Sequence, residues 1–208
     1  EAGGDDYLVK PVKPIVLDVA RPAADAPAVD APAADQPAAE AKPEIPAEGA
    51  DAADYLIAKH GLTREQLAAN RQRIAERGAA VGFAFGERKQ VWNTFDAHRL
   101  LYWAGAEGPP GAQHALKRAL LQAYHGDGRN PGAHDVLLEL ALAAGLDGDR
   151  ARAVLASEAF ADEVREAERF WQEAGIQAVP AVVINRRHLI SGGQLPEVFA
   201  QALRRIAA

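Results

Sequence analysis

Four consecutive residues, Ala181-Val-Val-Ile184, constrain the fold more than any other part of this 208-residue chain. They are apolar without interruption and mostly β-branched, which is typical of a strand buried on both faces. Asn185-Arg-Arg187 then predicts a tight turn, and His188-Leu-Ile190 predicts a second strand. Because a hairpin with one helix is not a stable sheet in water, another strand is needed. We expect Ile15-Val-Leu-Asp-Val19 to pair with Ala181–Ile184.

Helical patterns fill most of the chain between these strands. Thr63-Arg-Glu-Gln66 forms a capping box, which predicts a helix from there to about Ala80. Phe160, Val164, Ala167 and Trp171 recur at helical spacing on one face, ahead of Gly175. The other expected helices cover residues 55–60, 93–106, 113–124, 133–144, 149–156 and 196–208. This order predicts an α/β fold in which a helical subdomain, residues 51–174, precedes a β-β-α half, residues 175–208.

A separate, low-complexity segment covers residues 20–50. Prolines recur there every five residues, at Pro22, Pro27, Pro32 and Pro37, among many alanines and scattered acids. Proline removes a backbone donor, and alanine buries too little surface to offset an ordering entropy of about 1–2 kcal/mol per residue. We therefore predict a disordered, extended linker that separates residues 1–19 from the body of the protein.

Composition excludes several classes of function. The chain holds no cysteine, so it forms no disulfide and offers no thiolate to a metal. Its six histidines are dispersed and form no HExxH motif, so we expect no metal site. A net charge of −6 argues against a nucleic-acid partner, and no apolar run approaches the 18 residues of a membrane span. With no secretory signal visible, we expect a cytoplasmic protein.

Four segments of residues 42–208 resemble the FrnE-like branch of the DsbA family, a thioredoxin fold with a large helical insertion. The segments are Pro43–Gly49 leading into Asp54-Tyr-Leu56, Asn93-Thr-Phe-Asp-Ala-His-Arg-Leu100, Gly175–Asn185 and Pro196–Leu203. Kappa-class glutathione transferases and hydroxychromene-carboxylate isomerases share parts of this pattern. The resemblance implies a thioredoxin-like sheet, here incomplete, and an ancestral activity in protein disulfide oxidation.

The catalytic motif that the resemblance implies is missing. In that family a first strand leads into Cys-Pro-x-Cys, where the helix N-terminus lowers the pKa of the first cysteine. Arg21, Pro22, Ala23 and Ala24 occupy the corresponding position here. We therefore expect no catalytic residue, no cofactor and no redox activity from this chain.

The resemblance also implies a set of substrate-binding residues. Val179-Pro180 matches the cis-proline that presents backbone to an extended peptide or to glutathione, although a trans proline at a strand start is the structural alternative. Ser191 and Gln194 match positions that hold glutathione in kappa-class relatives, or else end a strand. Asn93 and His98 either face the cleft, or serve as a helix cap and a buried hydrogen-bonding group, and we favour the second interpretation.

Two further interpretations stay open. Gly3-Gly-Asp-Asp-Tyr-Leu-Val-Lys-Pro11 resembles the end of a response-regulator receiver domain, where a lysine contacts the phosphoryl group, and Lys10 would be a remnant of that lysine. On that interpretation residues 12–19 form a helix, and the rest of the chain is an output module. Separately, loss of the family's central βα unit predicts exposed apolar surface on Ala181–Ile184, which would favour a homodimer through that strand.

Overall fold

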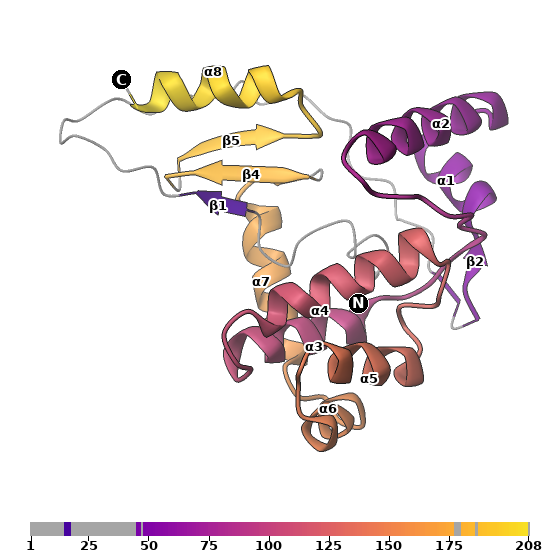
Figure 1. The fold of residues 1–208 in the computed structure, drawn as a ribbon, viewed down its shortest axis with the longest axis vertical. Helices are drawn as coiled ribbons and strands as arrows, with labels where there is room; N and C mark the ends of the chain where they lie inside the picture. The colour runs from indigo at the N-terminus through magenta and orange to yellow at the C-terminus, as the bar shows by residue number, and fades with distance from the viewer. Residues whose placement is uncertain (1–14, 18–44, 47, 177–179, 186, 208) are drawn as a thin grey trace. The chain divides into compact units, whose positions relative to one another are not determined.

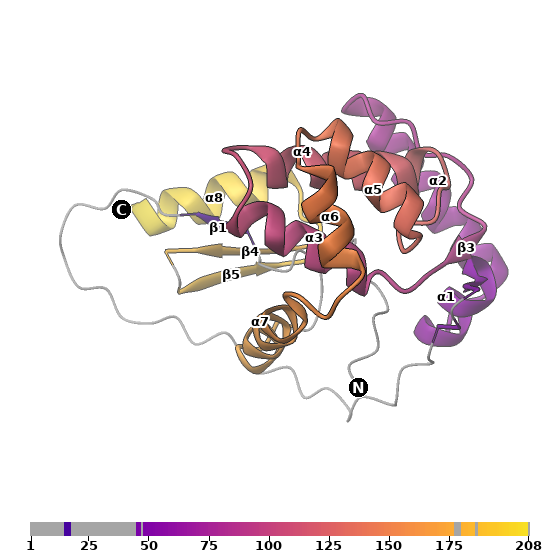
Figure 2. The same ribbon diagram turned by 90° about the horizontal axis from the view of Figure 1, so that it is seen from below.

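The computed structural model describes residues 15–17, 45–46, 48–176, 180–185 and 187–207. These fall into two compact units. The first runs to Val164, and the second contains residues 15–17 together with Arg165 onward. Figures 1 and 2 show the helices of the first unit and the small sheet of the second unit. In the part of the chain that is described, no helix is long and apolar enough to cross a membrane.

The second unit is built on a three-stranded sheet in the order β1-β4-β5. Its strands are β1 (Ile15–Leu17), β4 (Ala181–Ile184) and β5 (His188–Ser191). β4 pairs antiparallel with β5, and the amphipathic helix α8 (Pro196–Ala207) runs alongside this hairpin (Figure 1). β1 pairs with β4 in parallel, with Ile15 opposite Val182 and Leu17 opposite Ile184. The predicted third strand is thereby confirmed, and Ile15–Leu17 is a strand rather than part of a helix.

β4 lies between the two other strands, and all four of its residues are buried. The predicted burial on both faces is therefore confirmed. The expectation of exposed apolar surface on this strand is wrong, because β1 and β5 pair with its two sides. A homodimer through the sheet stays a prediction, and it would have to use an outer strand.

The first unit is helical. Two short strands, β2 (Ala50–Asp51) and β3 (Gln90–Val91), pair antiparallel at its start. The helices follow the predicted order: α1 (Ala52–His60), α2 (Arg64–Ala80), α3 (Phe95–Ala106), α4 (Ala112–Leu121), α5 (His134–Ala143), α6 (Gly148–Leu155) and α7 (Ala161–Glu173), which continues into the second unit.

Apolar side chains from α3 to α6 make the main core of this unit. Its largest fully buried members come from four different helices: Leu100, Leu116, Leu120, Leu137 and Val154. A smaller cluster of Ala52, Tyr55 and Val91 joins α1 to β3. The main core fixes α3, which carries the Asn93–Leu100 motif, against α4, α5 and α6.

Local signals set most of the helix ends. Thr63 and Gln66 form both hydrogen bonds of the predicted capping box. α7 is followed by Gly175, whose φ of +83° suits a residue without a Cβ. The predicted helix 113–124 differs from the structure, since α4 ends at Leu121 and a π-helical turn, η1 (Gln122–Gly126), follows. The β2–β3 pair was not predicted, because each strand is only two residues long.

Several predictions concern residues outside the described part of the chain. They are most of the linker predicted at 20–50, the Arg21–Ala24 segment, Val179 and its peptide bond to Pro180, and the receiver-like segment with Lys10.

Candidate functional site

Three of the predicted substrate-binding residues meet at one end of the β4–β5 hairpin. Ser191 is the last residue of β5 and pairs with Ala181, the first residue of β4. The N–H of Gly192 donates to the carbonyl oxygen of Pro180 at 2.8 Å. The side chain of Gln194 folds back, and its Nε2 donates to the Ser191 carbonyl oxygen at 2.9 Å. Pro180, Ser191 and Gln194 therefore form one polar corner, which we call the hairpin end.

The hairpin end is open to solvent and retains polar groups for a ligand. Pro180, Ser191 and Gln194 are all exposed. In the described part of the chain, the Ser191 hydroxyl and the Gln194 side-chain oxygen have no hydrogen-bond partner. A hydroxyl donates and accepts, and an amide oxygen accepts, so together they suit a ligand with ammonium, amide or carboxylate groups. They supply no nucleophile that is activated by a neighbouring base.

Because of its direction, β1 ends at the edge of the sheet opposite the hairpin end. Since β1 and β4 are parallel, the chain leaves β1 beside Ile184, whereas Pro180 precedes Ala181 at the other end of β4. The four residues of β4 put about 10 Å between these ends, at about 3.3 Å per residue. The described part of β1 therefore leads away from Pro180, while Arg21–Ala24 lie outside the described residues.

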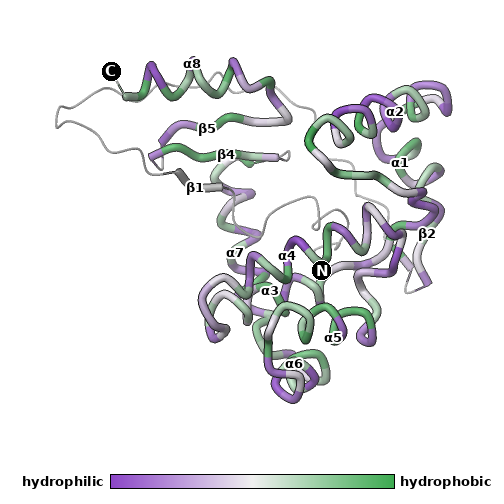
Figure 3. The backbone as a smooth tube through the Cα atoms, viewed as in Figure 1, coloured by the Kyte–Doolittle hydropathy of each residue, from purple (hydrophilic) through white to green (hydrophobic). Residues whose placement is uncertain are grey.

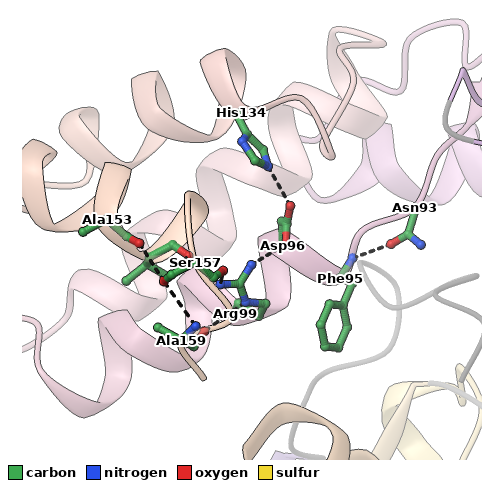
Figure 4. A network of polar contacts seen from close by, with 9 residues as sticks. Asn93, Phe95, Asp96, Arg99, His134, Ala153, Ser157 and Ala159 are labelled. Carbon is green, nitrogen blue, oxygen red and sulfur yellow. Dashed lines mark hydrogen bonds and ion pairs between the residues drawn. The ribbon is translucent and has the colours of Figure 1, made fainter. Parts of the chain in front are cut away.

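The structure places His98 on α3 and Asn93 just before this helix, both in the first unit. The Asn93 side-chain oxygen accepts a hydrogen bond from the Phe95 N–H at 2.8 Å, and so satisfies a donor in the first turn (Figure 4). Asn93 lies one residue before the N-cap, Thr94, whose own side chain makes no capping bond. His98 is completely buried. The hydrogen bond of Asn93 fits its interpretation as a helix cap. The burial of His98 shows only that its imidazole lies inside the protein. The part of both residues in binding stays a prediction.

The same motif contains a buried arginine that joins three segments. Arg99 is only 3% exposed, yet it ion-pairs with Asp96 at 2.7 Å and donates to the Ala159 carbonyl at 2.9 Å. It also donates to the carbonyls of Val154 and Ser157 (Figure 4). These oxygens belong to the end of α6 and the turn into α7, where helical carbonyls lack the N–H of a following helical turn. Arg99 thus fixes the α6–α7 connection against α3.

Asp96 links this arginine to α5. One of its oxygens binds Arg99, and the other lies 2.7 Å from Nε2 of His134, the first residue of α5 (Figure 4). The motif was recognised in the sequence, but no role was predicted for the ion pair of Asp96 and Arg99. The available signal was an i,i+3 acid–base pair within a helix whose neighbouring positions, Ala97, Leu100 and Leu101, are apolar.

The strongest pKa shifts occur away from both groups of candidate residues. Burial, together with the nearby charges of Arg88 and Lys117, lowers the pKa of His125 to about 4. Burial also lowers the pKa of Lys117 to about 8. His125 lies in η1, where its ring contacts those of Tyr124 and Phe85. Among the described residues, no three acidic, histidine or cysteine side chains come together as metal ligands would.

Comparison with known proteins decides the family. The sequence profile of the DSBA-like thioredoxin domain matches residues 42–204. The chain belongs to the DSBA-like thioredoxin family. A probable DsbA oxidoreductase from Streptomyces coelicolor is 38% identical, with a TM-score of 0.68 over 75% of this chain and 67% of that chain. Membership of the DsbA family, which was recognised from the four sequence segments, is thereby confirmed, as is the DsbA-type fold with a helical insertion. The FrnE-like branch stays a prediction.

More distant structures share the fold alone. A putative protein disulfide isomerase from Nitrosomonas europaea is 17% identical, with a TM-score of 0.55 over 69% of this chain and 74% of that chain. A 2-hydroxychromene-2-carboxylate isomerase is 16% identical, with a TM-score of 0.56 over 78% of each chain. A search of curated proteins gave no match. A relative of this chain is thus described as a probable oxidoreductase, whereas the chain itself has no cysteine.

Proposed function

We propose that this chain is a FrnE-like DsbA-family protein without thiol–disulfide activity, which binds an extended peptide or glutathione at the hairpin end. The observation that carries the first half is the absence of cysteine from all 208 residues. Thiol–disulfide exchange proceeds by attack of a thiolate on a disulfide sulfur, through a mixed disulfide with the enzyme. A chain without sulfur nucleophiles cannot form that intermediate. Serine and threonine do not replace a thiolate in this chemistry.

The hairpin end supports the second half of the proposal. Its backbone geometry is held by the Gly192–Pro180 and Gln194–Ser191 hydrogen bonds, while the Ser191 hydroxyl points to no partner in the described chain. Glutathione and extended peptides both offer amides and a terminal carboxylate, which match a hydroxyl and an amide. The proposal includes a cis Val179-Pro180 bond, which the family resemblance favours, and a cytoplasmic location.

An insulin-reduction assay tests the loss of redox activity. With dithiothreitol as the reductant, we expect the chain to precipitate insulin no faster than buffer does, whereas a cysteine-containing DsbA-type protein accelerates it. Turnover above the buffer rate would contradict the proposal. The control is the same chain with Cys introduced by Arg21→Cys and Ala24→Cys; its inactivity would agree with the direction of β1, which leads away from Pro180.

A further inference from the structure

The outer edge of β5 carries backbone groups that no described strand pairs with. In the sheet order β1-β4-β5, β4 lies on one side of β5, and the described residues place no strand on its other side. Figures 1 and 2 together show α8 over one face of this sheet, so α8 does not cover the outer edge of β5. An open edge is a template for another extended chain, because its N–H and C=O groups point outward.

The register of the hairpin determines which backbone groups point outward. The N–H of Gly192 donates to the carbonyl oxygen of Pro180, so these two residues form a hydrogen-bonded pair across the hairpin. Hydrogen-bonded and non-hydrogen-bonded pairs alternate along an antiparallel ladder. Ser191 and Leu189 therefore belong to non-hydrogen-bonded pairs, and their N–H and C=O groups point away from β4. The bond from Gln194 to the Ser191 carbonyl oxygen fits this direction.

Most of these outward groups are open. The Ser191 carbonyl accepts from Gln194, whereas the Ser191 N–H and both backbone groups of Leu189 have no partner among the described residues. Leu189 also has a side chain that is 43% exposed. Figure 3 shows hydrophobic residues along β4 and in the middle of β5. The edge thus offers backbone donors, a backbone acceptor and an apolar contact to an extended chain.

These groups fit a separate peptide better than a second copy of this strand. A two-fold pairing of two β5 edges around Ile190 would need the Ser191 carbonyls, which Gln194 already binds. A pairing around Leu189 would place Ser191 opposite Arg187, which lies in the turn before β5. A peptide sets its own register, and so it can place one residue opposite Leu189 and another opposite Ser191.

We propose that an extended peptide adds a further, antiparallel strand to the outer edge of β5. One of its residues exchanges both backbone hydrogen bonds with Leu189 and packs an apolar side chain on it, and a second residue accepts from the Ser191 N–H. This mode of binding rests on the proposed function, because Ser191 belongs to both the hairpin end and this edge. Glutathione reaches only the hairpin end, because its glutamate is linked through the side chain, which breaks the regular backbone of a strand.

Backbone methylation of a peptide tests this mode of binding. The probe is a hexapeptide of alternating valine and threonine with acetylated and amidated ends, titrated into the ¹⁵N-labelled chain. When a valine lies opposite Leu189, the valine N–H groups face β5 and the threonine N–H groups face away. A version N-methylated at its valines therefore loses the donors to β5. A version N-methylated at its threonines keeps them and is the matched control.

We expect saturable shifts of the Leu189 and Ser191 amides with the unmodified probe. Methylation at valine should weaken binding at least about tenfold, and methylation at threonine by less than about threefold. Leu189→Pro removes an outward donor and leaves the bonds to β4, so it should weaken binding at least about fivefold, whereas Leu189→Val should bind like the wild type. Circular dichroism checks that both variants are folded.

Equal affinity for the two methylated probes, or an unmoved Leu189 amide, would overturn the proposal. Reduced glutathione is titrated in parallel. Shifts at Gly192 with glutathione, but none at Leu189 with the probe, would contradict the edge alone, whereas no shift with either ligand would contradict the proposed function as well. Sedimentation equilibrium of the free chain completes the test. Self-association of the wild type that Leu189→Pro abolishes would assign the edge to a second copy and overturn its assignment to a peptide.

Discussion

Removing the Arg99 side chain should destabilise the helical unit more than any other single charge removal in α3. Its guanidinium serves four acceptors at once: the Asp96 carboxylate and the carbonyls of Val154, Ser157 and Ala159. In Arg99→Ala these acceptors lose their donor inside a site that is 3% exposed. A hydrogen bond from a charged donor contributes about 1.5–3 kcal/mol, and breaking a buried ion pair costs about 3–5 kcal/mol.

Part of this loss is recovered, because Asp96 is 29% exposed and keeps His134 as a partner. We therefore expect Arg99→Ala to lower the free energy of unfolding by about 3 kcal/mol, a large share of a typical 5–15 kcal/mol. With a urea m-value near 2 kcal/mol/M, the unfolding midpoint should fall by about 1.5 M. Arg99→Lys should lie between, since an ammonium keeps the charge but lacks the planar set of donors.

The assay is urea unfolding followed by far-UV circular dichroism. Arg152→Ala is the matched control, because Arg152 binds Asp149 on the surface with side chains 59% and 95% exposed. Surface pairs of this kind contribute little, so the control midpoint should not move measurably. A midpoint for Arg99→Ala that equals the control's would refute the role assigned to Arg99 in holding the α6–α7 connection.

The remaining predictions concern backbone space, charge and capping. Gly86→Ala should cost at least about 2 kcal/mol, since its Cβ would lie 1.9 Å from the Gly126 carbonyl oxygen, whereas Gly193→Ala meets nothing and should be silent in the same urea titration. The pKa of His125 falls from 6.5 to about 4 on folding, so the unfolded state binds its proton more tightly. The free energy of unfolding should therefore drop by up to about 3 kcal/mol as pH falls from 6.5 to 4. In His125→Gln the free energy of unfolding should depend less on pH in this range, and an unchanged pH profile would contradict the burial of a neutral ring. Thr63→Ala should lower the thermal midpoint through a loss of about 1 kcal/mol, and an unchanged midpoint would mean that the capping box does not stabilise α2.

Local patterns allowed most helices to be predicted, because caps and apolar spacing act over a few residues. The capping box at Thr63 and the apolar face of α7 are examples. The pairing of Ile15–Leu17 with β4 was predicted from the need of Ala181–Ile184 for two neighbours. Its parallel direction was not, because an apolar run looks the same from either end. That direction matters, since it sets where the chain leaves β1 relative to Pro180.

Interactions between residues far apart in the chain could not be predicted from the sequence. Arg99 was visible as a charge in an apolar helix, but its carbonyl partners lie 55 to 60 residues away.

Ser191 and Gln194 were identified through family resemblance, and their contact with each other could not be seen from residue types alone. The π-helical turn at Gln122–Gly126 was also missed, since alanine and glutamine there suit an ordinary helix equally well.

The central claim is that the hairpin end binds without redox chemistry, and one titration tests both parts. Oxidised glutathione is added to the ¹⁵N-labelled chain up to millimolar concentration in the presence of a dithiol reductant. The reduced glutathione that forms is measured in the same tube. We predict saturable shifts of the Ser191 and Gly192 amides and of the Gln194 side-chain amide, weakened in Ser191→Ala, with glutathione released no faster than in buffer. Unmoved amides, or disulfide reduction faster than the buffer rate, would contradict the account.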